Sequence, residues 1–282
     1  MTHTIRAARP RLRTRGWWWK SALVLAIGAF YLLPLFISFN VALRPSTDTR
    51  SLWELPTDLY LGNFIEAFAS GGIGRAALNS IIITATSIVI IAVVGAFAAY
   101  PLARRRTRTN VSIKALVLGV MMVPPLSILV SLYATMVDLG GVSTYWGIVL
   151  MLVTFELPLA IFIFSNFISA IPVALDEAAA IDGAGPFRTF FSVILPQLKP
   201  VTASVVILTG MHAWNDYQFS LYLLQKPGMR SLPLSIASFF SQTTSDLNAA
   251  TAAAIIAMLP AVLLFLLLQR YFIKGMVDSA LK

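Results

Sequence analysis

Long apolar stretches alternate with short polar segments along this chain. Four stretches without a charged residue cover residues 21–43, 76–103, 115–137 and 247–269. Two more cover residues 143–170, with Glu156 inside, and 201–224, with His212 and Asp216 inside. Each is close to the roughly 20 apolar residues that a helix needs to cross a bilayer, and none alternates as the strands of an outer-membrane barrel do. The pattern therefore predicts an all-α integral membrane protein with six transmembrane helices.

Basic residues set the predicted orientation, because Lys and Arg in short loops stay on the cytoplasmic side of a membrane. The first 20 residues hold six basic residues and no acid, whereas the loop 44–75 holds three basic and four acidic residues. The loop after the second stretch is basic again, with Arg104, Arg105, Arg106, Arg108 and Lys114. This alternation places both termini and the segment 172–200 in the cytoplasm.

Composition excludes several function classes. The chain is 58% hydrophobic and 12% charged, which is outside the range of a soluble domain of 282 residues. Its net charge of +9 is spread over predicted cytoplasmic loops beside anionic lipid headgroups, so we expect no nucleic acid as partner. The absence of cysteine excludes disulfides and thiolate chemistry, and two histidines, His3 and His212, offer no metal cluster. No phosphate-binding Walker pattern occurs, so any ATP must be bound by another chain.

The polar segment 172–200 interrupts the apolar pattern between the fourth and fifth predicted helices. Asp176 and Glu177 suit the first turn of a helix, and Gly183 and Gly185-Pro186 suit its end, which is equally compatible with an ordinary amphipathic hairpin. The segment nevertheless resembles the cytoplasmic signature loop of the membrane subunits of binding-protein-dependent ABC importers, in which Glu-Ala-Ala is followed by Gly and by Ile-x-Leu-Pro. Val193 replaces the usual Ile.

The resemblance implies that this loop is a coupling helix, which docks into a groove of an ATPase subunit. Glu177 would pair with a basic residue there, the alanines would permit close backbone approach, and Gly183 would permit the turn. The residues to which we assign this coupling role are Glu177, Ala178, Ala179, Asp182, Gly183, Leu195 and Pro196.

Further motifs narrow the resemblance to the carbohydrate branch of these permeases, and to the smaller six-helix subunit of the maltose-transporter-like pair. They are Leu78-Asn79-Ser80, Ala99-Tyr100-Pro101-Leu102-Ala103-Arg104, Met122-Val123-Pro124-Pro125, Trp214-Asn215-Asp216 and Leu268-Gln269-Arg270-Tyr271-Phe272. The resemblance implies a type I ABC importer permease fold in the cytoplasmic (inner) membrane of a bacterium or archaeon. It also implies three kinds of partner: a second homologous permease, two ATPase subunits that bind ATP and Mg, and an extracytoplasmic sugar-binding protein. This chain itself would hold no cofactor and would not be an enzyme.

Ionisable groups inside the predicted helices indicate a pathway. A charge near the bilayer centre costs about 2.5 to 3.5 kcal/mol, so we expect such groups to face the bundle interior or water. Aromatic and hydrogen-bonding groups around Asp216 are of the kind that holds a sugar, unless the fifth span is shorter and Asp216 lies at the outer interface. The candidate pathway residues are Glu156, Trp214, Asn215, Asp216, Tyr217 and Asn79.

The outer loop 225–248 is expected to contact the binding protein through Lys226, Gly228, Ser241 and Gln242. The predicted organisation is a basic cytoplasmic tail (1–20), one transmembrane permease domain (21–273) and a cytoplasmic C-terminal tail (274–282). Two alternatives stay open: import of a solute that is not a sugar, and a proton-coupled secondary transporter with Glu156, Asp216 and His212 as relay. Inverted repeats, which are typical of many secondary transporters, are not evident.

Overall fold

The computed structural model describes residues 17–69, 72–240 and 246–280, and nearly all of its regular structure there is helical. The elements are α1 (Trp17–Ala42), α2 (Gly62–Ala69), α3 (Ile73–Arg104), α4 (Arg108–Met121), η1 (Pro125–Ile128), α5 (Leu129–Asp138), α6 (Tyr145–Ala170), α7 (Ala174–Ile181), α8 (Pro186–Thr189), η2 (Phe190–Ile194), α9 (Leu195–Gln197), α10 (Lys199–Trp214), α11 (Gln218–Leu223), η3 (Pro227–Met229), α12 (Leu232–Ala237) and α13 (Leu247–Ala280).

Four described helices are long and apolar enough to cross a membrane: α1, α3, α6 and the part of α13 up to Leu267. Two further candidate spans are each broken into a bent pair. The helix α4 meets η1 and α5 at 89°, and the segment α8–α9 meets α10 at 74°. The six predicted stretches are thus all helical, but the third and fifth are not single helices.

Prolines account for both breaks. Pro124 has extended backbone, and Pro125 follows it at the start of η1, so neither can donate the backbone hydrogen bond that would continue α4. Pro200 occupies the same early position in α10, directly after the bend at Leu198. By contrast, α1, α3, α6 and α13 each continue through a proline, and these prolines are Pro34, Pro101, Pro158 and Pro260.

Two helices end elsewhere than their apolar stretches do. The fifth stretch was expected to continue to residue 224 or to be shorter, and α10 ends at Trp214, with a short break before α11. The last helix runs to Ala280, so the segment from residue 274 to that point, which was predicted to be a C-terminal tail, is helical.

The core forms where α3 and α6 pack along each other. Gly95 permits this approach, because a Cβ built there would lie 3.1 Å from the Cβ of Ala160. Small residues at such contacts let helix backbones come close in membrane proteins. Phe164 and Ile91 are fully buried beside this contact, and α10 packs on α3, α6 and α13.

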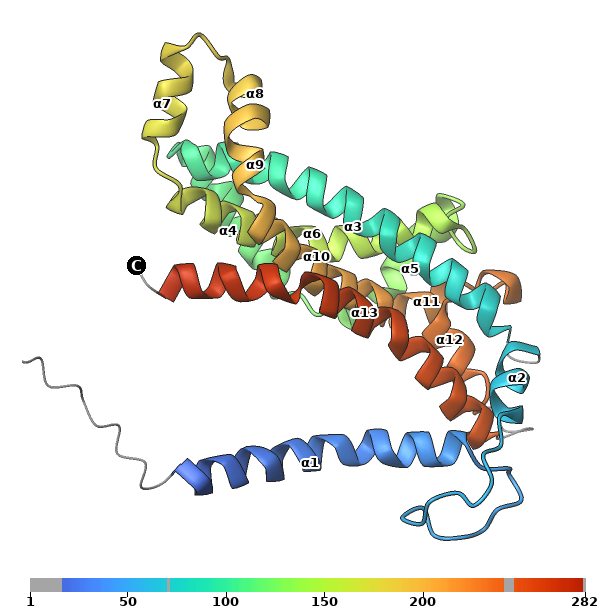
Figure 1. Cartoon of the computed structure of the whole chain (residues 1–282). Coiled ribbons are helices and arrows are strands. Elements are labelled where there is room, and N and C mark those ends of the chain that lie inside the picture. Colours follow the sequence, from blue (N-terminus) through green and yellow to red (C-terminus); the bar gives the residue numbers. More distant parts are fainter. Residues whose placement is uncertain (1–16, 70–71, 241–245, 281–282) are drawn as a thin grey trace, which may run out of the picture.

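The helix α1 stands apart from this bundle and meets it at one end, near α2 and α13 (Figure 1). Its apolar window has no buried residue, and its side chains are apolar all round. A helix of this kind needs lipid or another membrane protein around it.

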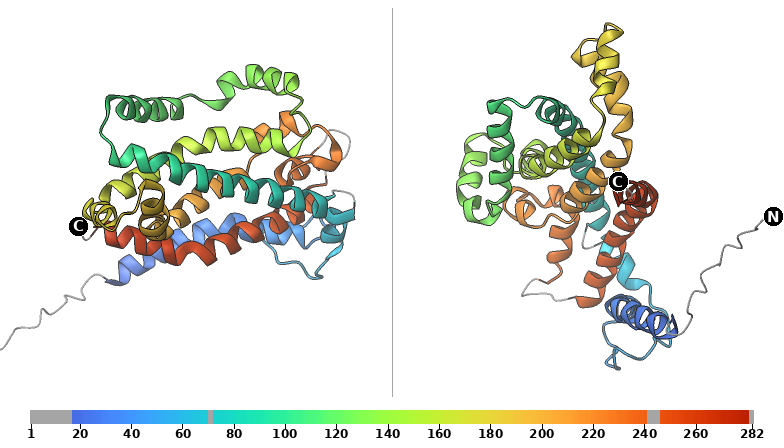
Figure 2. Two further views of the ribbon diagram at one scale, coloured as in Figure 1. Left: turned by 90° about the horizontal axis from the view of Figure 1, so that it is seen from above. Right: turned by 90° about the vertical axis from the view of Figure 1, so that its left-hand side faces the viewer.

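The molecule has two distinct ends (Figures 1 and 2). At the first, called the hairpin end below, α7 and α8 project beyond the bundle, and the described ends of α1 and α13 lie on the same side. At the opposite end lie α2, α11, α12 and the loop 43–61.

Candidate functional site

The hairpin end is built on the polar segment singled out in the sequence. Asp176 and Glu177 lie in the first turn of α7, where negative charge is favourable to the helix dipole. At the other end of α7, Gly183 has a φ of +76°, and the amides of Gly183 and Ala184 donate to the carbonyls of Ala180 and Ala179. This is a Schellman ending, which confirms the predicted left-handed glycine.

The tip of the hairpin exposes apolar side chains. Ile181 is 87% exposed and Phe187 is 76% exposed. Ala178 in α7 is exposed as well. Glu177 is exposed and forms no ion pair within the described part of the chain. The tip therefore presents apolar side chains together with a carboxylate that has no partner in the described chain.

The remaining residues assigned to coupling differ in exposure. Ala179 is buried against the rest of the hairpin, whereas Asp182 is exposed at the end of α7. Leu195 and Pro196 lie in α9, where both are exposed and line a cavity together with Lys199. The structure therefore brings the Glu-Ala-Ala and Leu-Pro parts of the signature loop onto the two arms of one hairpin.

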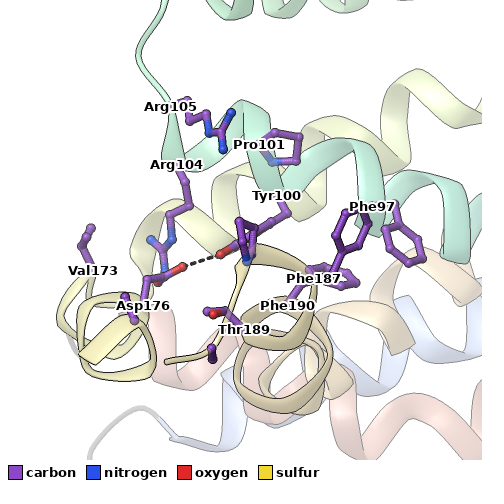
Figure 3. Close-up of a pocket in the computed structure, with 13 residues that line it drawn as sticks. Phe97, Tyr100, Pro101, Arg104, Arg105, Val173, Asp176, Phe187, Thr189 and Phe190 are labelled. Atoms are coloured by element: carbon purple, nitrogen blue, oxygen red, sulfur yellow. Dashed lines mark hydrogen bonds and ion pairs between the residues drawn. The ribbon is translucent and has the colours of Figure 1, made fainter. Parts of the chain in front are cut away.

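A side-chain cluster fixes the hairpin to the bundle (Figure 3). The hydroxyl of Tyr100 donates to Asp176 at 2.7 Å, and a guanidinium nitrogen of Arg104 lies 2.8 Å from the other carboxylate oxygen. Arg104 also donates to the carbonyls of Ile168 and Ile171 at the end of α6, at 3.0 and 2.8 Å.

Tyr100 and Arg104 belong to the motif at residues 99–104, and no role was predicted for either side chain. Their spacing of four residues at the end of an apolar helix, which puts both on one face, was the available signal. Beside the cluster lies a cavity of about 630 Å³ between α3 and the hairpin, with Phe97, Phe187 and Phe190 in its wall (Figure 3).

Three of the predicted pathway residues are used inside the protein. Trp214 is buried, and its indole donates to the carbonyl of Ala257 at 3.1 Å. The carboxylate of Asp216 accepts from the amides of Phe219 and Ser220, at 3.1 and 2.9 Å, and so caps the start of α11. The indole N–H of Trp214 and the carboxylate of Asp216 thus have partners within the chain.

Asn79 is the third of these residues. It is 2% exposed, accepts from the hydroxyl of Tyr145 at 2.8 Å, and donates to the carbonyls of Gly228 and Arg230 at 3.1 and 2.9 Å. Its amide therefore anchors the outer loop to α3, and it has no free donor for a ligand.

The other predicted pathway residues lie on α6 and in the break after α10, where Asn215 and Tyr217 are exposed and Glu156 is half-buried. A carboxylate oxygen of Glu156 lies 3.0 Å from Nδ1 of His212, whose side chain is 61% exposed. Asn215 and Tyr217 are exposed further toward the opposite end. Tyr217 lines a pocket of about 390 Å³ together with Gln225 and Arg230.

The outer loop 225–248 contains η3 and α12. Lys226 is exposed, and Gly228 is held by Asn79 as described above. Ser241 and Gln242, the other two residues assigned to binding-protein contact, lie outside the described residues.

A second ordered loop at this end, residues 43–61, was not singled out from the sequence. Arg44 is 2% exposed and donates to the side chain of Asn40 and to the carbonyls of Arg50, Ser51 and Glu54. Hydrogen bonds from the side chain and backbone of Arg50 lower the pKa of Asp48 to about 2.

Comparison with known proteins shows the family to which the chain belongs. Residues 91–278 match the family described as "Binding-protein-dependent transport system inner membrane component". The chain belongs to this family. It is therefore a permease subunit, a transport component of the inner membrane, which confirms the predictions for family, location and the lack of enzyme activity.

Curated relatives cover nearly the whole permease. The chain is 40% identical over 261 residues to the melibiose/raffinose/stachyose import permease protein MelC of Bacillus subtilis (strain 168), covering 92% of this chain and 95% of MelC. It is 36% identical to the probable starch degradation products transport system permease protein AmyC of Thermoanaerobacterium thermosulfurigenes, over 92% and 93% of the two chains. The trehalose transport system permease protein SugB of Mycobacterium tuberculosis (strain CDC 1551 / Oshkosh) is 31% identical, over 95% and 98%.

A solved structure shares the permease's fold. A chain from a bacterial ABC transporter involved in the import of the acidic polysaccharide alginate superposes with a TM-score of 0.77 at 20% identity, covering 95% of this chain and all of that one. The prediction of an importer-permease fold is therefore confirmed for the overall arrangement of the helices.

Proposed function

We propose that this permease forms half of the path by which an ABC importer carries a sugar, delivered by an extracytoplasmic binding protein, into the cell. The observation that carries the proposal is the 40% identity to MelC across 92% of the chain. AmyC and SugB, which are also named for sugar transport, are similar over as much of the chain. A second candidate, a small osmoprotective solute, is favoured by the 31% identity to the osmoprotective compounds uptake permease protein GgtD of Synechocystis sp. (strain ATCC 27184 / PCC 6803 / Kazusa).

In the proposed assembly the six helical stretches each cross the membrane once. The hairpin end faces the cytoplasm, since the basic loop 104–114 adjoins it and basic loops stay inside. The described ends of α1 and α13 lie on this side. The unburied apolar helix α1 would lie against a second, homologous permease, and two ATPase subunits would complete the importer.

The hairpin is the proposed contact with an ATPase subunit. Ile181 and Phe187 would bury their apolar side chains in its groove, and the free carboxylate of Glu177 would pair with a basic residue. The ATP and Mg would be bound by the ATPase chains, and this chain would hold neither.

The proposed sugar path follows the polar residues of α6, α10 and the break after α10. It would pass from the pocket at Tyr217, past Asn215, to the Glu156–His212 pair. Carboxylate, imidazole and amide groups can together donate to and accept from sugar hydroxyls. A charged residue within a membrane is costly unless it faces a water-filled path or a partner, and Glu156 has both in this arrangement.

Uptake by the reconstituted importer tests the proposal. The complete importer in proteoliposomes would be given binding protein, internal ATP and one radiolabelled solute at a time: melibiose, raffinose, maltotriose, trehalose or glycine betaine. We expect ATP-dependent uptake of at least one of the four sugars. Uptake of glycine betaine alone would favour the osmoprotectant function, and uptake driven by a proton gradient without ATP would overturn the importer assignment.

Cysteine labelling tests the path, because the chain has no cysteine of its own. We expect Asn215→Cys and Tyr217→Cys to react with a small water-soluble thiol reagent in the assembled importer. Trp214→Cys, one residue away but buried, is the matched control and should stay unlabelled. Labelling of Trp214→Cys without the other two would place the path on the opposite face of α10.

A further inference from the structure

Arg104 holds three helices together at the hairpin end. Its guanidinium contacts Asp176 in the first turn of α7, at 2.8 Å, and donates to two carbonyls at the C-terminal end of α6. It stands itself in the last turn of α3, and Tyr100 on the preceding turn binds the same carboxylate. The ends of α3 and α6 and the start of α7 thus meet at one cation.

The chemistry of this contact makes it stiff. The last carbonyls of a helix have no partner within the helix, and a cation there is also favoured by the helix dipole. A guanidinium is planar, and Nη1 of Arg104 donates to both carbonyls of α6, which fixes the side chain on that helix. Its Nη2 forms an ion pair with Asp176 but does not have the geometry of a hydrogen bond. The side chain of Arg104 is 10% exposed and that of Asp176 is 17% exposed, so water screens their attraction little.

The other arm of the hairpin is attached differently. From α8 the chain passes through one wider π-helical turn, η2, and then bends by 74° at the junction of α9 and α10. Such π turns and proline-bounded bends are where helices change direction, and they are common at functional hinges. The first arm is thus held by an ionic contact to α3 and α6. The second arm packs Phe190 of η2 on Phe97 and Tyr100 of α3 and continues through a bend into α10.

We propose that Tyr100, Arg104 and Asp176 form a rigid joint through which movement of the hairpin is transmitted to α3 and α6 as one body. These are positioning residues: they fix the hairpin on the bundle and do not touch the ATPase or the sugar. The close packing of Gly95 on Ala160 makes α3 and α6 suited to move together. The proposal rests on the proposed function of the hairpin as the ATPase contact.

A double-mutant cycle in the reconstituted importer tests the joint. Asp176→Asn removes the charge with little change of shape, Arg104→Gln removes the cation, and the double variant removes both. We expect each to keep the ATPase subunit bound while the number of sugar molecules imported per ATP falls about tenfold, within the range usual for coupling between two sites. The double variant should be no worse than either single variant, because both act through one contact.

Three further variants separate transmission from simple stability. Arg104→Lys keeps the charge but loses the planar donors, so its import of sugar per ATP should be intermediate. Tyr100→Phe keeps the ring beside Phe190, so its import of sugar per ATP should fall less than that of Asp176→Asn. Arg105→Gln removes an exposed arginine next to the joint and should match the wild type.

Each result has a defined reading. Because Arg104→Gln leaves the carbonyl of Ile171 unpaired and can lower the yield of assembled importer, Asp176→Asn decides the outcome. A wild-type ratio of import to hydrolysis in Asp176→Asn overturns the joint. Loss of the ATPase subunit from Asp176→Asn also overturns it, since the residue then serves docking. A wild-type importer that hydrolyses ATP but moves no sugar refutes the proposed function instead.

Discussion

The two ends of the permease are held in different ways. At the hairpin end, one ionic cluster around Arg104 fixes a hairpin whose tip is exposed and apolar. At the opposite end, four asparagines each donate from one amide nitrogen to two backbone carbonyls of another segment. The pairs are Asn40 with Leu52 and Glu54, Asn63 with Ala42 and Arg44, Asn79 with Gly228 and Arg230, and Asn248 with Val41 and Arg44.

The two ends differ in whether contacts within the chain are enough to order their surface. Neutral amide-to-carbonyl bonds are directional and complete within this chain, so they build an outer surface that is ordered before any partner arrives. A preorganised surface loses less entropy when it binds. The hairpin leaves Ile181, Phe187 and Glu177 without intrachain contacts of that kind, so a partner must complete it. The end whose loops are tied by these amide bonds is suited to receive a partner, and the hairpin, whose tip lacks such bonds, is suited to move with one.

The largest expected effect tests the incomplete end. Glu177→Ala should abolish uptake and release the ATPase subunit, because a partly buried ion pair broken on one side costs about 3 to 5 kcal/mol. Co-purification of the ATPase subunit measures the release. Asp138→Ala, which removes another exposed carboxylate at the end of α5, should change neither uptake nor co-purification. Retention of the ATPase by Glu177→Ala would mean that the apolar tip alone carries the contact.

The next effect tests the asparagine contacts at the opposite end. Asn79→Ala leaves the hydroxyl of Tyr145 and the carbonyls of Gly228 and Arg230 without their partner, at a cost of about 1 to 3 kcal/mol for each buried group that stays unpaired. We expect weaker stimulation of ATP hydrolysis by the binding protein, with the ATPase subunit still bound.

The control for Asn79→Ala is Thr135→Ala, which removes only a local bond to Ser131 on an exposed face. Stimulation is measured as ATP hydrolysis at increasing concentrations of binding protein. If both variants need the same concentration as the wild type, the outer loop does not depend on the asparagine contact for docking.

A smaller effect isolates the turn of the hairpin. Gly183 and Gly185 both have open space where a Cβ would stand, but only Gly183 has a positive φ. Gly183→Ala should therefore cost about 1 to 2 kcal/mol and lower uptake, whereas Gly185→Ala should have no effect. Uptake and the thermal unfolding midpoint of both variants measure this. Equal behaviour of the two glycines would show that the left-handed turn is not needed.

The comparison also explains what the sequence could predict. The six apolar stretches, the first-turn acids of α7 and the turn at Gly183 follow from local rules of hydrophobicity, charge and backbone conformation, and the structure agrees with them. The roles of Trp214, Asp216 and Asn79 could not follow from such rules. Polar groups in an apolar stretch serve a pathway or a hydrogen-bonded anchor equally well, and only the position of distant carbonyls decides between them.

Other features depend on contacts between segments that are far apart in the sequence. The pairing of Glu156 with His212 spans 56 residues, and that of Tyr100 with Asp176 spans 76. The break after Trp214 was missed because apolar residues continue beyond it, and it is stabilised by the carboxylate of Asp216 on the amides of α11. Hydropathy does not detect a helix that restarts within an apolar stretch.

The smallest effect concerns the contact between Asp48 and Arg50 in the outer loop 43–61. Hydrogen bonds from Arg50 lower the pKa of Asp48 to about 2, against about 3.9 in an unfolded chain. A carboxyl group with a lowered pKa stabilises the folded loop above about pH 4, and this contribution is lost as the pH falls toward 2. The side chain of Arg50 is exposed, so the contribution of the pair is small, and uptake at pH 7 should be unchanged in Arg50→Gln. The carboxyl-carbon NMR signal of Asp48, assigned with Asp48→Asn, should then titrate near its ordinary pKa. An unchanged midpoint in Arg50→Gln would show that the buried cation Arg44, rather than Arg50, holds this carboxylate ionised.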